Sequence, residues 1–292
     1  MVTRSVCALA LVAGCGTAAR TERPAVEKTR VLPVEADGPV EPSGLALLDG
    51  ELLSVSDEDE VIFRIVVGES SALMEPWLVI EVPDPRPPEL DLEGIAVCEG
   101  RIFVLSEGAN DVMEVDPSGR SRWIGEGARS AAIARGLLGS PGAGLEGIAC
   151  AERGGLVLAS EREPRALLWL ALEEPGRVSS QILDLEDVVG RSFSSDFSDL
   201  SSEAGRLWAL YRYTYEILEV VGEPGSVALI PVAELSSVAL DPRHRYSSTR
   251  FGMAEGLALD DGYFYVIDDN NDLPRAEAPA DSRPLLFVIP RH

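Results

Sequence analysis

One short pattern recurs five times along this chain, and it restricts the possible folds more than any other feature of the sequence. Each copy contains a short apolar strand opened by a polar residue, then a second β-rich strand that ends in a charged residue. The central positions of the copies are Gly44, Gly94, Gly147, Asp199 and Gly256. They are 50, 53, 52 and 57 residues apart. Units of this length with several short strands are typical of β-propeller blades.

The segments between the copies contain further strands and hairpin turns instead of alternating strands and helices. Turns rich in Gly and Pro occur at 116–119 and 173–176, and one helical insert is expected at 128–138. Five blades are visible in the sequence, and a sixth, degenerate blade stays open. The segment 29–35 has no partner of its own, so we expect this N-terminal strand to pair into the last blade and close the ring. The predicted fold class is an all-β β-propeller.

The N-terminal region differs from the repeats. Arg4 precedes an apolar run at 6–13, which is too short to cross a bilayer, since a spanning helix needs about 20 residues. The Val-Ala-Gly-Cys quartet at 12–15 resembles a bacterial lipobox, in which Cys15 is lipidated after cleavage. A buried first strand that ends at a chance cysteine is the alternative. The expected division is 1–14 signal peptide, 15–28 lipidated cysteine and flexible tether, and 29–292 propeller domain.

The export signal also bears on location and on the remaining cysteines. Gly16, not Asp, follows the expected lipidation site, so the sorting rule for such lipoproteins favours the outer membrane in a Gram-negative host. We expect a periplasmic or cell-surface protein that touches the membrane only through its N-terminal lipid. An oxidising compartment permits a disulfide between Cys98 and Cys150, and two buried free thiols are the alternative.

The charge balance excludes one class of partner. The chain has 49 acidic and 25 basic residues, a net charge of −24. Nucleic-acid binding needs clusters of Lys and Arg against the phosphate backbone, so no nucleic-acid partner is expected. Acidity of this size commonly does no more than keep a protein soluble, and we expect a monomer.

Two sets of polar residues follow from the repeat. In an antiparallel hairpin the start of one strand lies beside the end of the next, so the residue that opens each first strand and the residue that ends each second strand should share one face of the disc. The first set is Ser43, Glu93, Glu146, Ser198 and Glu255, and the second is Asp57, Glu107, Glu161, Arg212 and Asp269. Both sets should surround one mouth of the central channel.

Such a mouth would hold mostly carboxylates, which at short range raise each other's pKa or require a cation. Ligands that are all oxygen suit Ca²⁺ or Mg²⁺, and a roomy mouth favours Ca²⁺, so the predicted cofactor is Ca²⁺. The predicted metal ligands are Glu93, Glu146, Glu255, Asp269 and Asp57. The alternative is that these carboxylates only cap backbone N–H groups around the ring.

The remaining charged positions provide candidate catalytic groups. Glu107 or Glu161 would accept a proton from water as the general base, and Arg212 would stabilise charge that develops on a phosphoryl or carbonyl oxygen. A salt bridge that balances the acidic rings is an equally open role for Arg212. The two histidines, His244 and His292, lie in a loop and at the chain end, and no nucleophile-elbow, zinc-protease or P-loop motif occurs, so a Ser-His-Asp triad is not expected.

Together these motifs resemble the phytase-like domain family, described as "esterase-like activity of phytase", over roughly residues 38–290. A more distant likeness is to the SdiA-regulated propeller proteins. The matching motifs are Ser43-Gly44-Leu45-Ala46, Leu92-Glu93-Gly94-Ile95-Ala96, Leu145-Glu146-Gly147-Ile148-Ala149, Asp199-Leu200 and Glu255-Gly256-Leu257-Ala258, each with its second strand. One departure is Tyr211 before Arg212, where the family more often has an acidic residue.

The resemblance implies an exported propeller that hydrolyses phosphate or carboxylic esters, with a small anionic ester or phosphate as substrate. From the residues alone, a metal-assisted hydrolase and a non-catalytic, calcium-stabilised propeller that binds a ligand or protein in the cell envelope both remain open.

Overall fold

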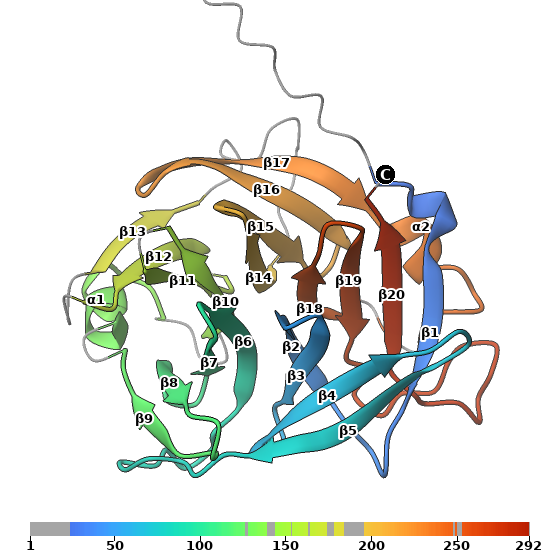
Figure 1. The fold of residues 1–292 in the computed structure, drawn as a ribbon. Helices are drawn as coiled ribbons and strands as arrows, with labels where there is room; N and C mark the ends of the chain where they lie inside the picture. Colours follow the sequence, from blue (N-terminus) through green and yellow to red (C-terminus); the bar gives the residue numbers. More distant parts are fainter. Residues whose placement is uncertain are drawn as a thin grey trace, which may run out of the picture.

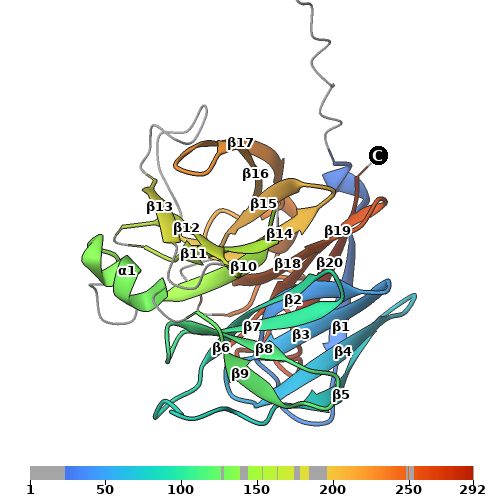
Figure 2. The same cartoon turned by 60° about the vertical axis from the view of Figure 1, so that its left-hand side comes forward.

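The strands of this protein form antiparallel sheets around a central axis, as Figure 1 and the turned view in Figure 2 show. The computed structural model describes residues 24–125, 128–138, 144–152, 154–162, 164–173, 178–183, 196–247, 249 and 253–291. Three sheets have four strands each, and an eight-stranded sheet consists of two further four-stranded units that meet where β1 pairs with β5. The described strands thus form five units, each with one innermost strand next to the axis.

The strands and helices have the following bounds. Unit 1 contains β2 (Pro42–Leu48), β3 (Glu51–Ser56), β4 (Val61–Val67) and β5 (Ala72–Val79). Unit 2 contains β6 (Leu92–Cys98), β7 (Arg101–Ser106), β8 (Asp111–Val115) and β9 (Ser121–Trp123). Unit 3 contains β10 (Leu145–Ala151), β11 (Gly155–Ser160), β12 (Ala166–Ala171) and β13 (Val178–Ile182). Unit 4 contains β14 (Phe197–Glu203), β15 (Arg206–Tyr211), β16 (Glu216–Glu223) and β17 (Ser226–Glu234). Unit 5 contains β18 (Ala254–Leu259), β19 (Tyr263–Asp268), β20 (Leu285–Pro290) and β1 (Arg30–Glu35). The helices of the described residues are η1 (Val26–Lys28), α1 (Ala128–Ala134) and α2 (Ser236–Ala239).

The innermost strands close a ring. β2 contacts β6, β6 contacts β10, β10 contacts β14, β14 contacts β18, and β18 returns to β2. The all-β propeller architecture predicted from the repeat is confirmed. In the described part of the chain, this cycle of neighbours contains five innermost strands.

The N-terminal strand completes the last unit, as predicted. β1 pairs antiparallel with β20, with Val31 opposite Phe287, and its end pairs in parallel with β5, with Val34 opposite Ala72. The first strand of the domain therefore joins unit 5 to unit 1. This pairing covers the outer edge of β20, which would otherwise expose a row of unpaired backbone groups.

Tight turns join the innermost strand of a unit to the next strand. The two-residue loops Asp49-Gly50, Glu99-Gly100 and Ala204-Gly205 have positive φ at both residues, from 49° to 84°. This is the backbone of a type I′ turn, whose twist matches that of paired strands. All these turns lie at the end of the hairpin opposite to the residues that open the first strand.

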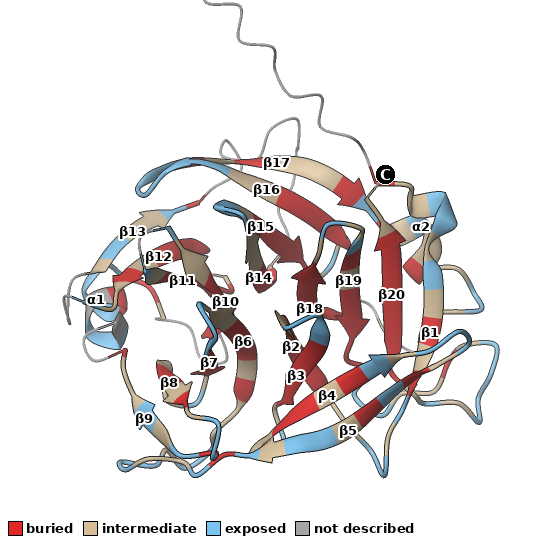
Figure 3. Ribbon diagram, viewed as in Figure 1, coloured by how far each residue is buried: buried red, intermediate tan, exposed pale blue. Residues whose placement is uncertain are grey.

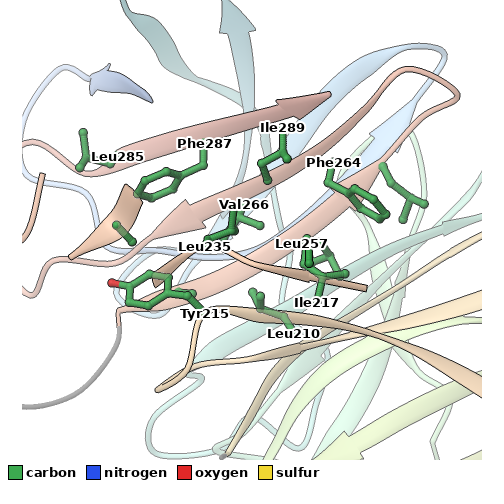
Figure 4. Packing of buried hydrophobic residues seen from close by; sticks show 14 of the residues in the cluster. Leu210, Tyr215, Ile217, Leu235, Leu257, Phe264, Val266, Leu285, Phe287 and Ile289 are labelled. Atoms are coloured by element: carbon green, nitrogen blue, oxygen red, sulfur yellow. The ribbon is translucent and has the colours of Figure 1, made fainter. Parts of the chain in front are cut away.

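The core lies between neighbouring sheets. Figure 3 shows buried residues concentrated on the innermost and middle strands, with exposed residues at outer strands and hairpin ends. Figure 4 shows one layer, in which Leu210 and Ile217 of unit 4 pack against Leu257, Phe264 and Phe287 of unit 5. Because the side chains of each strand alternate between two faces, every sheet contributes to the apolar layers on both of its sides.

A disulfide joins Cys98 and Cys150, whose Cα atoms are 5.6 Å apart. The alternative of two free thiols is therefore wrong. The bond connects the ends of β6 and β10, so it links the innermost strands of two adjacent units on the face that carries the tight turns.

The expected signal peptide, Cys15 and most of the expected tether lie outside the described residues. Residues 24–28, at the end of the expected tether, lie against the propeller: the N–H of Ala25 donates to the carbonyl of Pro290 at 3.0 Å, and η1 contacts β20. The helix predicted at 128–138 is present as α1. In the described part of the chain, no helix has the length and apolar composition needed to cross a membrane.

Candidate functional site

A break in strand pairing occurs at the same position of every unit. Between β6 and β7, Leu92 pairs with Ser106 and Gly94 with Leu105, so that Glu93 is an extra residue. The same irregularity leaves Glu146, Ser198 and Glu255 as extra residues of β10, β14 and β18. Unit 1 has its irregularity at Ser43-Gly44. Such β-bulges redirect a side chain and are frequent at active sites.

These bulge residues form the first predicted set, which we call the inner ring: Ser43, Glu93, Glu146, Ser198 and Glu255. The second set, which we call the outer ring, follows the second strand of each unit: Asp57, Glu107, Glu161, Arg212 and Asp269. A repeated backbone hydrogen bond fixes the outer ring to the entry of the first strand. The N–H of Glu107 donates to Asp91 at 2.8 Å, and that of Arg212 donates to Asp196 at 3.0 Å. The predicted gathering of both sets at one mouth of the ring is therefore what the structure shows.

Arg212 lies among the carboxylates of this mouth. Its Nη2 atom is 2.8 Å from an oxygen of Glu146 and 2.8 Å from an oxygen of Glu255, and its Nη1 atom is 3.7 Å from Glu161. All three carboxyl groups are buried. Two of the predicted metal ligands, Glu146 and Glu255, thus already share a guanidinium cation, which is the salt-bridge role left open for Arg212.

Three further carboxylates converge at this mouth, and none of them forms an ion pair with a basic residue of the described part of the chain. Asp91, Glu93 and Glu107 each offer an oxygen, and these oxygens all lie within 4.8 Å of one another. We call this group the carboxylate triad. Asp91 has a left-handed backbone with φ of 53°, a conformation that is uncommon outside glycine and costs free energy. Such a cost is frequent where a site requires one particular side-chain position.

A second group of this kind occurs in unit 1. Glu41, Asp57 and Glu58 also offer oxygens within 4.8 Å of one another. Asp57 has one buried oxygen without a hydrogen-bond partner among the described residues. Burial and the nearby charge of Asp269 raise its pKa to about 7. The five predicted metal ligands therefore do not meet in one group: Glu93 lies in the carboxylate triad and Asp57 in the unit 1 group, Glu146 and Glu255 contact Arg212, and Asp269 accepts the N–H of Asn271 at 2.9 Å.

The carboxyl groups of the mouth have raised pKa values. Burial, repulsion from Glu146 and a hydrogen bond with Asp91 raise the pKa of Glu107 to about 8. Burial raises the pKa of Glu146 to about 7, although Arg212 opposes the rise. Burial and the charges of Glu146 and Glu255 raise the pKa of Glu93 well above its usual range. A divalent cation would relieve this mutual repulsion.

Glu161 differs from the other acids because two arginines flank it. It forms ion pairs with Arg162 and, at 3.7 Å, with Arg212, and Arg162 also contacts Asp196 at 3.1 Å. Burial raises the pKa of Glu161 to about 7, and the two arginines oppose this rise. A carboxyl group with this pKa is able to exchange a proton near neutral pH.

The sequence-based reasoning missed Asp91, Glu41 and Asp196. All three stand three residues before the central position of their repeat, so an alignment of the five copies carries their signal. Of the two histidines, His244 follows α2 and its Nδ1 atom lies 2.8 Å from the carbonyl oxygen of Val238, and His292 lies outside the described residues.

The donor set suits a hard cation. The carboxylate triad offers only oxygen atoms, which Ca²⁺ prefers, and Ca²⁺ takes six to eight such ligands. Three carboxylates provide about three oxygens if each binds through one atom and up to about six if each binds through both, and water would complete the rest. The triad therefore fits Ca²⁺ by its chemistry.

A scan against family models identifies "Phytase-like: Esterase-like activity of phytase" over residues 41–276. The chain belongs to this phytase-like family. The match includes both rings and the carboxylate triad, so the mouth is part of the region that defines this phytase-like domain. No curated protein matches the chain.

Solved structures resemble the phytase-like domain in fold. Glutaminyl cyclase from Myxococcus xanthus is 14% identical, with a TM-score of 0.56 over 89% of this chain and 93% of that one. A streptogramin B lyase is 13% identical, with a TM-score of 0.45 over 86% of this chain and 71% of that one. A putative gluconolactonase is 11% identical, with a TM-score of 0.46 over 85% and 74%. At these identities the likeness shows the fold alone.

Proposed function

We propose that this phytase-like propeller is a metal-assisted hydrolase of phosphate or carboxylic esters, with its site at the acidic mouth. One observation carries the proposal: Asp91, Glu93 and Glu107 bring their oxygens within 4.8 Å of one another, near a partly buried arginine, Arg212, and a carboxyl group that can exchange a proton. This combination contains a cation site, a base and a charge-stabilising group, which ester hydrolysis requires.

The residues take the following roles. Asp91, Glu93 and Glu107 would hold Ca²⁺, which supplies charge neutralisation and a more acidic bound water. Glu161 accepts the proton of the attacking water, since its pKa of about 7 leaves it partly ionised at neutral pH. Arg212 keeps Glu146 and Glu255 in place and has an exposed part, with 20% of its side chain accessible, which can contact the ester oxygen.

The proposal is tested with the purified propeller domain. p-Nitrophenyl phosphate and p-nitrophenyl acetate serve as substrates, with calcium or with a chelator. We expect turnover that the chelator abolishes and that Glu93→Gln and Glu161→Gln each reduce at least tenfold. Glu99→Gln is the matched control, because Glu99 is an exposed carboxylate of unit 2 in the turn at the opposite face. Turnover that survives Glu93→Gln and the chelator would contradict the proposal.

A second candidate is a non-catalytic propeller that calcium stabilises and that binds a ligand or protein. It is favoured by a cavity of about 670 Å³ on the face with the tight turns, a volume usual for small-molecule sites. Trp169, Leu207 and Val227 contribute apolar surface to its lining, and Glu99 and Glu152 contribute charge. Calcium-dependent thermal stability without turnover of either ester would favour this function over the hydrolase.

We also propose that the protein is exported, lipidated at Cys15 and anchored in the outer membrane. The N–H of Ala25 bonds Pro290, which pairs with Tyr263 at the turn end of unit 5, so the described chain begins near the face opposite the acidic mouth. Labelling with a radioactive fatty acid tests the proposed lipidation: Cys15→Ser should abolish the label and release the protein from membranes.

A further inference from the structure

The central position of the repeat is glycine in units 1, 2, 3 and 5, whereas unit 4 has Asp199 there. A Cβ atom on Gly44 would come within 2.7 Å of Gly94 Cα, and one on Gly147 would come within 2.7 Å of the Leu200 nitrogen. Both distances are shorter than any normal contact. The innermost strands therefore approach so closely at the axis that these units admit no side chain there, and Asp199 alone extends one.

The carboxyl group of Asp199 accepts hydrogen bonds from several units at once. Its Oδ2 atom accepts the N–H of Leu45 in β2 at 3.2 Å and that of Leu257 in β18 at 2.7 Å. Its Oδ1 atom accepts the N–H of Leu200 in β14 at 2.7 Å, and the N–H of Ile148 in β10 also donates to this group. The residue is fully buried.

These donors are the N–H groups that no neighbouring strand can pair. An innermost strand has a partner on one side only, so alternate N–H groups on its other edge point toward the axis. A buried N–H without an acceptor costs free energy. One carboxyl group with two oxygens satisfies the donors of four units, from β2, β10, β14 and β18.

The same donors lie next to the acidic mouth in the sequence. Leu45, Ile148, Leu200 and Leu257 each follow the inner-ring residue of their strand by two positions. The corresponding inner-ring residues are Ser43, Glu146, Ser198 and Glu255. A group that holds the four N–H groups at the axis therefore also limits how far the inner-ring residues can move.

We propose that the axis of this propeller is a carboxyl-binding site built from the backbone N–H groups of four units, with Asp199 as its built-in ligand. Asp199 is thereby a positioning residue for the inner ring. The ligand class of the site is a small monocarboxylate, because the side chain of aspartate is acetate joined to the backbone. Removing the side chain by Asp199→Gly restores the glycine of the other units and leaves a space the size of acetate.

The experiment measures thermal unfolding of the whole mature domain in sodium acetate and in sodium chloride at equal ionic strength. Asp199→Gly should melt about 10 °C below the wild type in chloride, as expected for the loss of several buried hydrogen bonds. Acetate should raise its melting temperature in a saturable way and recover at least half of the loss, by binding the folded state. The wild type should respond equally to the two salts.

Two further variants separate this site from general salt effects. Leu218→Ala removes a fully buried apolar side chain between units 3 and 4, so it should lower the melting temperature without any acetate-specific recovery. Asp199→Asn keeps one acceptor oxygen and fills the space, so it should be destabilised and insensitive to acetate. Benzoate is too large for the vacated space and should not rescue Asp199→Gly.

Several outcomes would overturn the proposal. They are an Asp199→Gly variant as stable as the wild type, an equal response of that variant to acetate and chloride, or an acetate response of the same size in Leu218→Ala. If Asp199→Gly does not fold in chloride, its refolding in acetate is the test. Recovery of the folded domain in acetate supports the carboxyl-binding site, and failure to fold in acetate rejects it. None of these readouts depends on hydrolytic activity, so they are independent of the proposed function.

Discussion

The Nη2 atom of Arg212 lies 2.8 Å from an oxygen of Glu255, although the first residue follows β15 of unit 4 and the second is the bulge residue of β18 in unit 5. The same nitrogen is 2.8 Å from Glu146 of unit 3. One guanidinium therefore connects three consecutive units at the acidic mouth. It neutralises part of a charge that would otherwise push these units apart.

Removing this guanidinium should be costly. Arg212→Ala leaves Glu146 and Glu255 buried without their cation, and breaking such a pair from one side costs about 3 kcal/mol in the free energy of unfolding. Urea unfolding at pH 8 measures this loss in the free energy of unfolding. Arg64→Ala is the control, because Arg64 pairs with Glu75 at 2.6 Å on the surface, where such pairs contribute about 0–1 kcal/mol. Equal effects of the two variants would contradict this role of Arg212.

Stability should decrease as the pH rises through neutrality. The pKa of Glu161 and of Glu146 is raised to about 7 in the folded state from a usual value of 4.5, so the folded state binds more protons than the unfolded state between these values. The associated stability is fully present below pH 4.5 and is lost as the pH passes 7. Melting temperatures of the chelator-treated domain should fall from pH 5 to pH 8.

Glu161→Gln provides the comparison for this pH dependence. The variant cannot ionise at this position, so its melting temperature should vary less between pH 5 and pH 8 than that of the wild type. Unchanged pH dependence in Glu161→Gln would show that Glu161 does not titrate in this range.

The disulfide should make a large contribution to stability. Cys98 and Cys150 are 52 residues apart, and closing a loop of this length in the unfolded chain is worth about 4 kcal/mol in the entropic model. Replacing both cysteines by serine should reduce the free energy of unfolding by about this amount, and a reducing agent should then have no further effect. A loss below about 1 kcal/mol would contradict the prediction.

The close approach of the innermost strands makes Gly147 hard to replace. A Cβ atom there would lie 2.7 Å from the Leu200 nitrogen and 2.8–2.9 Å from Asp199 backbone atoms, so Gly147→Ala should destabilise the domain by about 2 kcal/mol or more. In Gly262→Ala the nearest contact is 3.5 Å, to Asp260, and the effect should stay within about 0.5 kcal/mol. Denaturant unfolding of both variants decides this, and equal stability of the two would count against the packing at the axis.

The repeat predicted the ring and the gathering of both polar sets, because hairpin geometry alone determines which strand ends share a face. It left the role of Arg212 open between a charge-stabilising group and a salt bridge, and it did not predict that the partners are Glu146 and Glu255. That outcome depends on how far a long side chain reaches across two unit boundaries, which strand spacing does not determine. Asp91 was missed because it precedes the first strand of its unit by one residue and lies outside the two sets of positions that the hairpin geometry relates.

The role of Asp199 could not be predicted from the sequence either. In the sequence, Asp199 is only a replacement of the glycine at the central position of the repeat. The role of its carboxyl group becomes visible only in the structure, where four backbone N–H groups surround it at the axis. The glycines themselves were visible, but the closeness of the strands that requires them was not.

Calcium binding by the purified mature domain tests the central claim most directly, namely that the carboxylate triad at the mouth is a cation site. Titration calorimetry after removal of metals should show saturable calcium binding in the wild type and in Glu99→Gln, and at least tenfold weaker binding in Glu93→Gln. The absence of calcium binding in the wild type, or equal binding by Glu93→Gln, would contradict the account.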